Sequence, residues 1–294
     1  MRRTAAPGQK RGGESLPALH GPSPYRALER TLSADCGACC GLCCVALYFA
    51  AGEGFPADKP AGKPCEFLTP KDRCAVHDSL YARGLHGCAA YDCFGAGQYV
   101  AREVYGGCGW RDPEADAGVL FGAFLTAQRL HQMLWYLVEA AALKPAAPLR
   151  AEVDARAVEL LELRRLPAPE LAALDAVPCR QRVNGLLRRV WEEVRRAAGG
   201  RPDARGGTDF AGKDLRGAEL AGRDFGMALL IAADLRGCRL YGTNLIGADL
   251  RGADLRDADL RECVFLAQGQ LGAARGNGGT LLPERLARPA GWER

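Results

Sequence analysis

A strict five-residue repeat limits what this 294-residue chain can fold into more than any other feature of its sequence. Between Phe210 and Phe265 every fifth residue is large and apolar, which gives twelve in unbroken register: Phe210, Leu215, Leu220, Phe225, Leu230, Leu235, Leu240, Leu245, Leu250, Leu255, Leu260 and Phe265. The residue before each of them is most often Asp or Asn, and the residue two before is usually small. A helix repeats every 3.6 residues and a strand every two, so neither presents this pattern on one face.

A chain that turns a corner after each five-residue unit accounts for this pattern. Four such units close one square coil of about 20 residues, and stacked coils pair their backbones as a parallel β-helix. Residues 206–265 are therefore expected to form about three coils. Lys213 and Arg223 occupy small-residue positions, which marks the first coil as irregular or as the end that meets another domain. The segment 247–256, Gly-Ala-Asp-Leu-Arg-Gly-Ala-Asp-Leu-Arg, resembles the pentapeptide repeat family, and the resemblance implies a right-handed quadrilateral β-helix.

A second feature is a dense group of cysteines, since ten of the thirteen lie between Cys36 and Cys108. The first five are spaced so that, if the segment is helical, their sulfurs share one stripe of the helix. Cys-x-x-Cys spacing is typical of zinc and iron–sulfur ligation. The predicted metal ligands are Cys36, Cys39, Cys40, Cys43, Cys44, Cys65, Cys74, Cys88 and Cys93.

These cysteines also resemble the zinc- or iron-chelating CxxCC cysteine-cluster family. The matching motifs are the unit at 36–40, Cys65-Glu-Phe-Leu, Arg73-Cys74-Ala-Val-His77, and the final pair Cys88 and Cys93. The chain departs from that family before the last pair, where Arg-Gly-Leu-His-Gly at 83–87 replaces the usual Arg-Pro. The resemblance implies bound Zn²⁺ or iron.

Several interpretations of the cysteines remain open. The alternatives are a tetrahedral Zn²⁺ site, an iron–sulfur cluster, redox-active or disulfide-bonded thiols, and buried cysteines that act only as small apolar side chains. His77 and His86 are expected to be packed or exposed, with metal ligation as the alternative. The remaining candidates for core packing are Cys179, Cys238, Cys263 and His131.

The predicted architecture is an α+β multi-domain protein. Its parts are a disordered leader (1–33), a Cys-rich metal-binding module (34–112), a helical connector (113–200), the β-helix (206–265) and a C-terminal cap (266–294). Three- and four-residue apolar spacing predicts one long helix after Asp116, with others at 149–165, 169–176 and 181–197. The helices before Gly206 are expected to cover the first-coil end of the β-helix.

Composition narrows the functional classes. The net charge of +4 comes from intermixed charges, which does not indicate a nucleic-acid partner, and no apolar run is long enough to span a membrane. The leader lacks the apolar segment of a signal peptide, so the expected compartment is the cytoplasm. No acid–base pair, nucleophile motif or phosphate loop is present in the sequence, so enzymatic activity is left uncertain.

Three functional hypotheses follow. The first is a non-enzymatic metal-binding protein whose solenoid face binds a protein partner. The second is an iron–sulfur or thiol redox enzyme with the solenoid as scaffold. The third is a DNA mimic that binds topoisomerases. The charge of residues 206–265 argues against it, because their ten acidic and eight basic side chains nearly balance.

Overall fold

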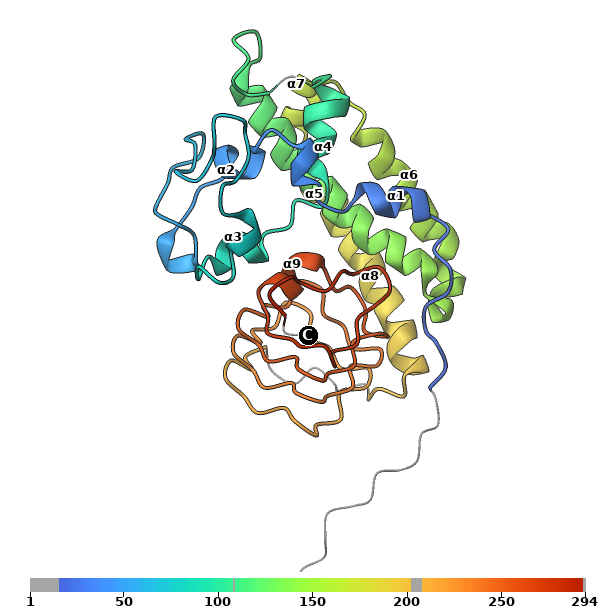
Figure 1. The fold of residues 1–294 in the computed structure, drawn as a ribbon. Coiled ribbons are helices and arrows are strands. Elements are labelled where there is room, and N and C mark those ends of the chain that lie inside the picture. The colour runs from blue at the N-terminus through green and yellow to red at the C-terminus, as the bar shows by residue number, and fades with distance from the viewer. Residues whose placement is uncertain (1–15, 108, 202–207, 293–294) are drawn as a thin grey trace, which may run out of the picture.

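The computed structural model describes residues 16–107, 109–201 and 208–292. Figure 1 shows a coiled C-terminal part, a group of helices above and beside it, and a lobe of loops and short helices that contains α2 and α3. The lobe corresponds to the Cys-rich module, and the helix α9 lies between it and the coils (Figure 1).

Residues 16–33 are ordered, which corrects the expected disordered leader for this part of the chain. Leu19 and Leu32 are buried, and α1 spans Arg26–Thr31. The backbone at His20 forms an antiparallel bridge with Leu143, and the Gly21 N–H donates to the Ala142 carbonyl oxygen at 2.8 Å. Residues 1–15 lie outside the described residues. Tertiary contacts thus fix a segment whose own sequence is rich in Pro and Gly.

The helical connector is built around one long buried helix. α5 spans Ala117–Ala142, and the Asp116 side chain caps it by accepting hydrogen bonds from the next N–H groups. The helices α6 (Arg150–Leu163), α7 (Ala168–Ala173) and α8 (Val177–Ala197) follow, with a 3-10 segment, η5, at Lys144–Leu149. α8 begins four residues before the predicted start at 181, because Pro178 is compatible with the first turn of a helix.

The repeats coil with a period of four units. Backbone pairs 20 residues apart form parallel bridges, namely Asp209 with Leu229, Asp214 with Asp234, Asp224 with Asn244, Leu229 with Asp249, Asp234 with Asp254, Arg239 with Asp259 and Asn244 with Val264. Within the described residues of this region the pairing consists of isolated bridges rather than continuous strands. The repeated apolar residues are buried, except that Leu215 in the first coil is only partly buried. Their stacking forms the core of the coil.

The C-terminal segment extends the stack by one irregular coil. The Leu255 N–H donates to the Arg275 oxygen and the Leu260 N–H to the Leu281 oxygen, each at 2.8 Å. α9 (Gln268–Gly272) lies within this turn, and the Trp292 indole N–H donates to the Ala274 oxygen at 3.1 Å. The segment therefore caps the stack while still pairing with it, which removes an exposed edge.

Among the described residues no helix lies across the first-coil end, although the chain at the end of α8 touches this coil, since a Cβ at Gly222 would lie 2.8 Å from Gly200 and 3.2 Å from the Arg195 oxygen. α5 instead contacts the other end, where the Trp135 indole N–H donates to the Leu266 oxygen at 3.2 Å. α8 runs along the side of the coils, with Ala198 against Gly242 (Figure 1). At the first coil, Lys213 and Arg223 instead place their cationic groups 4.9 and 5.5 Å from the centre of the Phe210 ring.

A buried charge cluster joins the N-terminal segment, α5 and the coils. His20 Nδ1 lies 3.0 Å from Glu262 and its Nε2 lies 3.2 Å from Glu139. Glu139 is 3% exposed, lies 3.3 Å from Arg285, and accepts the Phe265 N–H at 3.0 Å. Burial disfavours the charged imidazole, but the hydrogen bonds to Glu139 and Glu262 outweigh it and raise the pKa of His20 to about 9. His20 is thus a cation that holds two carboxylates together.

Because of this cluster, the folded protein is expected to lose stability at alkaline pH. Because the folded pKa of His20 is about 9 and its ordinary value is 6.5, its contribution is complete below pH 6.5 and is lost as the pH rises through 9. The expected loss is about 3 kcal/mol of unfolding free energy. Urea unfolding between pH 6 and pH 9.5 measures it, and His20→Gln is expected to flatten this pH dependence. Equal slopes for the wild type and His20→Gln contradict the assignment.

Candidate metal centre

The Cys-rich module is held by short turns rather than long elements. Its helical segments are η1 (Cys36–Ala38), α2 (Leu42–Ala46), η2 (Ala51–Glu53), η3 (His77–Ser79), α3 (His86–Ala90), α4 (Ala96–Tyr99) and the π-helical η4 (Val100–Val104). Antiparallel bridges at Phe49 with Lys59 and Leu68 with Cys74 close two loops. The module has few large buried side chains of its own, chiefly Leu42, Phe49 and Phe94.

The first five cysteines do not share one helical stripe, which corrects the expectation for this segment. Cys36 starts a single 3-10 turn, Cys39 is extended, and Gly41 adopts a left-handed conformation with φ of 70°. α2 begins only after that turn. Glycine is suited to such a backbone, and a Cβ there would also lie 2.7 Å from Leu68. The turn at Gly41 therefore sets the directions of the cysteine side chains on either side of it.

Eight of the nine predicted ligands nevertheless line one cavity, of about 280 Å³. They are Cys36, Cys39, Cys43, Cys44, Cys65, Cys74, Cys88 and Cys93. Cys40 is not among its lining residues and lies instead beside Gly109, with the Trp110 indole N–H donating to its carbonyl oxygen at 3.0 Å. Segments up to 57 positions apart along the chain thus bring their thiols to a common space.

Neighbouring thiols interact in and beside this space. The sulfurs of Cys43 and Cys44 lie 4.0 Å apart, and either can donate to the other. Cys74 interacts with Cys44, and outside the cavity Cys40 interacts with Cys39. Gly97 on α4 faces Cys39 and Cys93, since a Cβ at this position would lie 2.7 Å from the Cys39 sulfur and 3.9 Å from the Cys93 sulfur. Only glycine leaves these sulfurs their present room.

The electrostatics of the cavity favour neutral thiols. Burial raises the pKa of Cys88 and of Cys93 to about 12, and hydrogen bonding to Cys43 raises the pKa of Cys44. Outside the cavity, the Cys39 thiol instead lowers the pKa of Cys40. Forming thiolates inside the cavity therefore needs a compensating cation, and metal binding would release protons.

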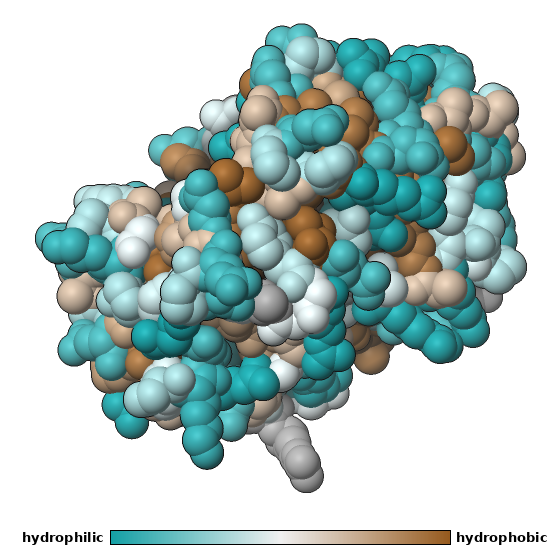
Figure 2. Space-filling view, turned by 90° about the horizontal axis from the view of Figure 1, so that it is seen from above, coloured by the Kyte–Doolittle hydropathy of each residue, from teal (hydrophilic) through white to brown (hydrophobic). Residues whose placement is uncertain are grey.

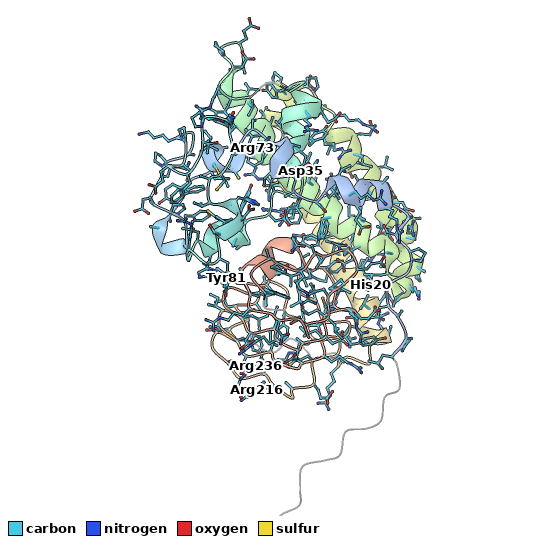
Figure 3. All side chains as sticks on the ribbon, in the orientation of Figure 1. His20, Asp35, Arg73, Tyr81, Arg216 and Arg236 are labelled. Carbon is cyan, nitrogen blue, oxygen red and sulfur yellow. The ribbon has the colours of Figure 1, made fainter. Side chains whose placement is uncertain are left out.

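Two basic side chains support the loops around the cavity, and neither was identified from the sequence as functional. The Lys59 ammonium is buried and donates to the carbonyl oxygens of Val45, Leu47, Pro60 and Lys63 at 2.6–3.2 Å. Arg73, labelled in Figure 3, donates to the carbonyl oxygens of Cys36 and Cys39. The position of Arg73 directly before Cys74 is a sequence signal that could have identified Arg73 as part of the site. Lys59 belongs to none of the cysteine motifs, so the sequence gives no such signal for it.

The histidines and remaining cysteines separate by location. His77 lines the cavity but its side chain is half exposed, while His86 is not among the lining residues and packs on Tyr81 with ring centres 4.8 Å apart. Cys179, Cys238 and Cys263 are buried in α8 and the coils, in agreement with core packing. Cys108 lies outside the described residues. None of the described cysteines forms a disulfide.

The donor set fits a thiolate-bound metal in residue type and in its shared cavity. Among the described residues, no three Cys, His, Asp or Glu side chains already converge on a point as metal ligands do. Rotation of the thiols toward the cavity is therefore needed to complete a ligand set. Thiolates in such numbers are the ligands of Zn²⁺ and of iron–sulfur clusters.

In the described part of the chain, no helix is both long and apolar enough to span a bilayer. On the face shown in Figure 2, hydrophobic residues reach the surface in separate patches among hydrophilic ones.

Comparison with known proteins identifies the repeats. The family described as pentapeptide repeats matches residues 228–265 in eight copies. The chain is also 43% identical over 167 residues to the Bacillus subtilis (strain 168) protein described as "Uncharacterized protein YybG". The aligned segment covers 57% of this chain and 60% of that protein. The chain thus spans less than two thirds of that relative's length. Only 89 residues run from position 206 to the end, so at least 78 of the aligned residues precede the repeats.

Proposed function

We propose that the chain binds metal through the thiolates of its cysteine cavity and uses its pentapeptide-repeat coils as a scaffold for a protein partner. The observation that carries the proposal is the convergence of eight cysteines on one cavity without a disulfide among them. The ligands would be drawn from these eight side chains. A bound Zn²⁺ or iron–sulfur cluster would crosslink loops that have little core of their own, and so supply folding free energy. Free thiols in this number favour a reducing compartment, which supports the cytoplasm.

The charge pattern of the coils argues against mimicry of DNA. Arg216, Arg236 and Arg256 each bond to the aspartate two positions earlier, at 2.7, 2.6 and 2.6 Å. Arg216 also lies 3.3 Å from Asp234 in the next coil, and Arg236 lies 3.7 Å from Asp254. Figure 3 labels two of these arginines, on successive coils. Because each carboxylate in this column is neutralised, the column lacks the continuous negative charge of a duplex.

The alternative is a redox enzyme whose chemistry takes place on an iron–sulfur cluster or on the thiols. Anaerobic purification of the full chain, followed by metal and sulfide analysis and a visible absorption spectrum, distinguishes the two. Colourless protein with stoichiometric zinc supports the scaffold and contradicts the cluster enzyme. Brown protein with iron and acid-labile sulfide supports a cluster and contradicts a zinc site. Folded protein without any metal contradicts the metal proposal itself.

A further inference from the structure

A second cavity, of about 730 Å³, is lined in part by Gln98 and Tyr99 of α4 and shares no lining residue with the cysteine cavity. Its walls come from η4, α5, the loop before α7 and the chain around Asp35, which Figure 3 labels. Cavities of this size commonly hold small molecules. Its lining includes His131, Arg164, Tyr99 and Arg102.

His131 presents an unpartnered acceptor to this cavity. The side chain is fully buried, and Nδ1 lies 2.8 Å from the Phe94 carbonyl oxygen. A carbonyl only accepts, so Nδ1 carries the proton and the neutral ring leaves Nε2 as a bare acceptor. Nε2 is buried and has no hydrogen-bond partner. Burial lowers the pKa of His131 to about 4, which keeps the imidazole neutral at physiological pH.

Arg164 supplies an unpartnered donor from the lining of the same cavity. Its guanidinium lies 4.9 Å from the centre of the Tyr99 ring, and the same ring lies 5.1 Å from that of His131. The Tyr99 hydroxyl donates to the Arg164 carbonyl oxygen at 2.7 Å, which fixes the ring that both side chains contact. The Arg164 Nε is buried without a hydrogen-bond partner. Buried polar atoms rarely lack a hydrogen-bond partner. An unpaired donor and an unpaired acceptor in the lining of one cavity therefore indicate a ligand that bonds to both.

The charges of the cavity specify the sign of that ligand. Arg102, Arg164 and Arg165 line it against Asp35 and Glu103, so the walls carry an excess of positive charge. Arg165 is already bonded to Glu162 at 2.7 Å, whereas the Nε of Arg164 has no such bond. A guanidinium suits the oxygens of a phosphate or carboxylate, and His131 Nε2 requires an O–H or N–H donor.

We propose that this cavity binds a protonated phosphate, either inorganic hydrogen phosphate or a small phosphate monoester, whose anionic oxygens contact Arg164 and whose P–O–H donates to Nε2 of His131. The size of the cavity leaves space for an organic group on the ester. The inference does not depend on the metal proposal, because the two cavities have no residue in common.

Calorimetric titration of the full chain at pH 6 with inorganic phosphate, glycerol phosphate and sulfate tests the proposal, because a phosphate monoester keeps its P–O–H on about half of its molecules at this pH. Sulfate has nearly the same shape but no O–H at pH 6, so it is expected to bind at least about tenfold more weakly than phosphate. Tighter binding of glycerol phosphate than of phosphate identifies the ester as the ligand, and the reverse identifies free phosphate. Equal binding of sulfate and phosphate, or no binding of either, overturns the proposal.

Variants locate the site. Arg164→Met is expected to weaken phosphate binding at least about tenfold, while Arg189→Met, with the same charge change on a residue that pairs with Glu152 and does not line the cavity, is expected to weaken it less than about threefold. Equal effects of the two overturn the assignment. Because His131 lies in the core, wild-type protein labelled with ¹⁵N-histidine provides an independent reading. The bare Nε2 resonance is expected to shift with phosphate and not with sulfate, and an unmoved resonance at saturating phosphate contradicts the contact.

Discussion

Replacing Cys44 and Cys74 together by serine is expected to abolish stoichiometric metal binding and to unfold much of the Cys-rich module. The two thiols interact with each other and line the cavity from segments 30 positions apart, so both are placed to hold one ion. Structural Zn²⁺ sites contribute about 10 kcal/mol or more of apparent folding free energy, a loss that the small core of the module does not offset. Metal analysis and near-ultraviolet circular dichroism of the purified variant measure the two effects.

Two single variants serve as controls for this experiment. Cys179→Ala removes a buried thiol of α8, remote from the cavity, and is expected to keep the full metal content. Cys40→Ser tests the geometry more sharply, because Cys40 belongs to the same sequence motif but does not line the cavity. We expect it to retain metal as well. Wild-type metal content in the Cys44/Cys74 double variant, or equal loss in all three proteins, contradicts the assigned ligand cavity.

Glu139→Ala is expected to destabilise the fold by about 3–5 kcal/mol, the effect of removing one partner from a buried ion pair. Glu139 is almost fully buried, and its loss leaves Arg285 without its carboxylate while the guanidinium stays stacked on Trp135 at 3.7 Å. It also leaves the Phe265 N–H without its acceptor. Urea unfolding at pH 6 measures the difference.

Glu152→Ala is the matched control for this substitution. Glu152 also pairs with an arginine, Arg189, at 2.6 Å, but both side chains are about half exposed. Exposed ion pairs contribute less than about 1 kcal/mol. Comparable destabilisation by the two substitutions would show that burial is not what makes the Glu139 cluster strong.

The coil was predictable because its period is written directly in the sequence. Repeats of five place Leu230 and Leu250 one above the other, and the parallel bridges at 20-residue spacing confirm that four units close a turn. The final coil was not predicted, since residues 266–292 carry no repeat and their pairing with Asp254 and Asp259 depends on the coil beneath them. A sequence repeat predicts the coils that the repeat itself forms, and it does not predict a coil that forms by pairing with them.

The N-terminal segment shows the same limit. Its order rests on His20 contacts with Glu139 and Glu262, residues 119 and 242 positions away. Composition describes only the local chain and therefore indicated disorder. No spacing rule links such distant residues.

The candidate site was predictable in residue type but not in direction. Cysteine spacing predicted nine metal ligands, and eight of these nine side chains line one cavity. The ninth, Cys40, does not line it, because the left-handed turn at Gly41 directly after it redirects the chain. The second cavity was not predicted, since His131 matched the apolar periodicity of α5 and gave no separate signal. Only the fold brings Arg164 and His131 to the same Tyr99 ring.

X-ray absorption spectroscopy at the edge of the bound metal, on anaerobically purified full-length protein, tests the thiolate centre most directly. The expected result is a first shell of sulfur, at about 2.3 Å if the metal is zinc. A first shell of only nitrogen and oxygen, or folded protein that contains no metal, would contradict the centre proposed for the cysteine cavity.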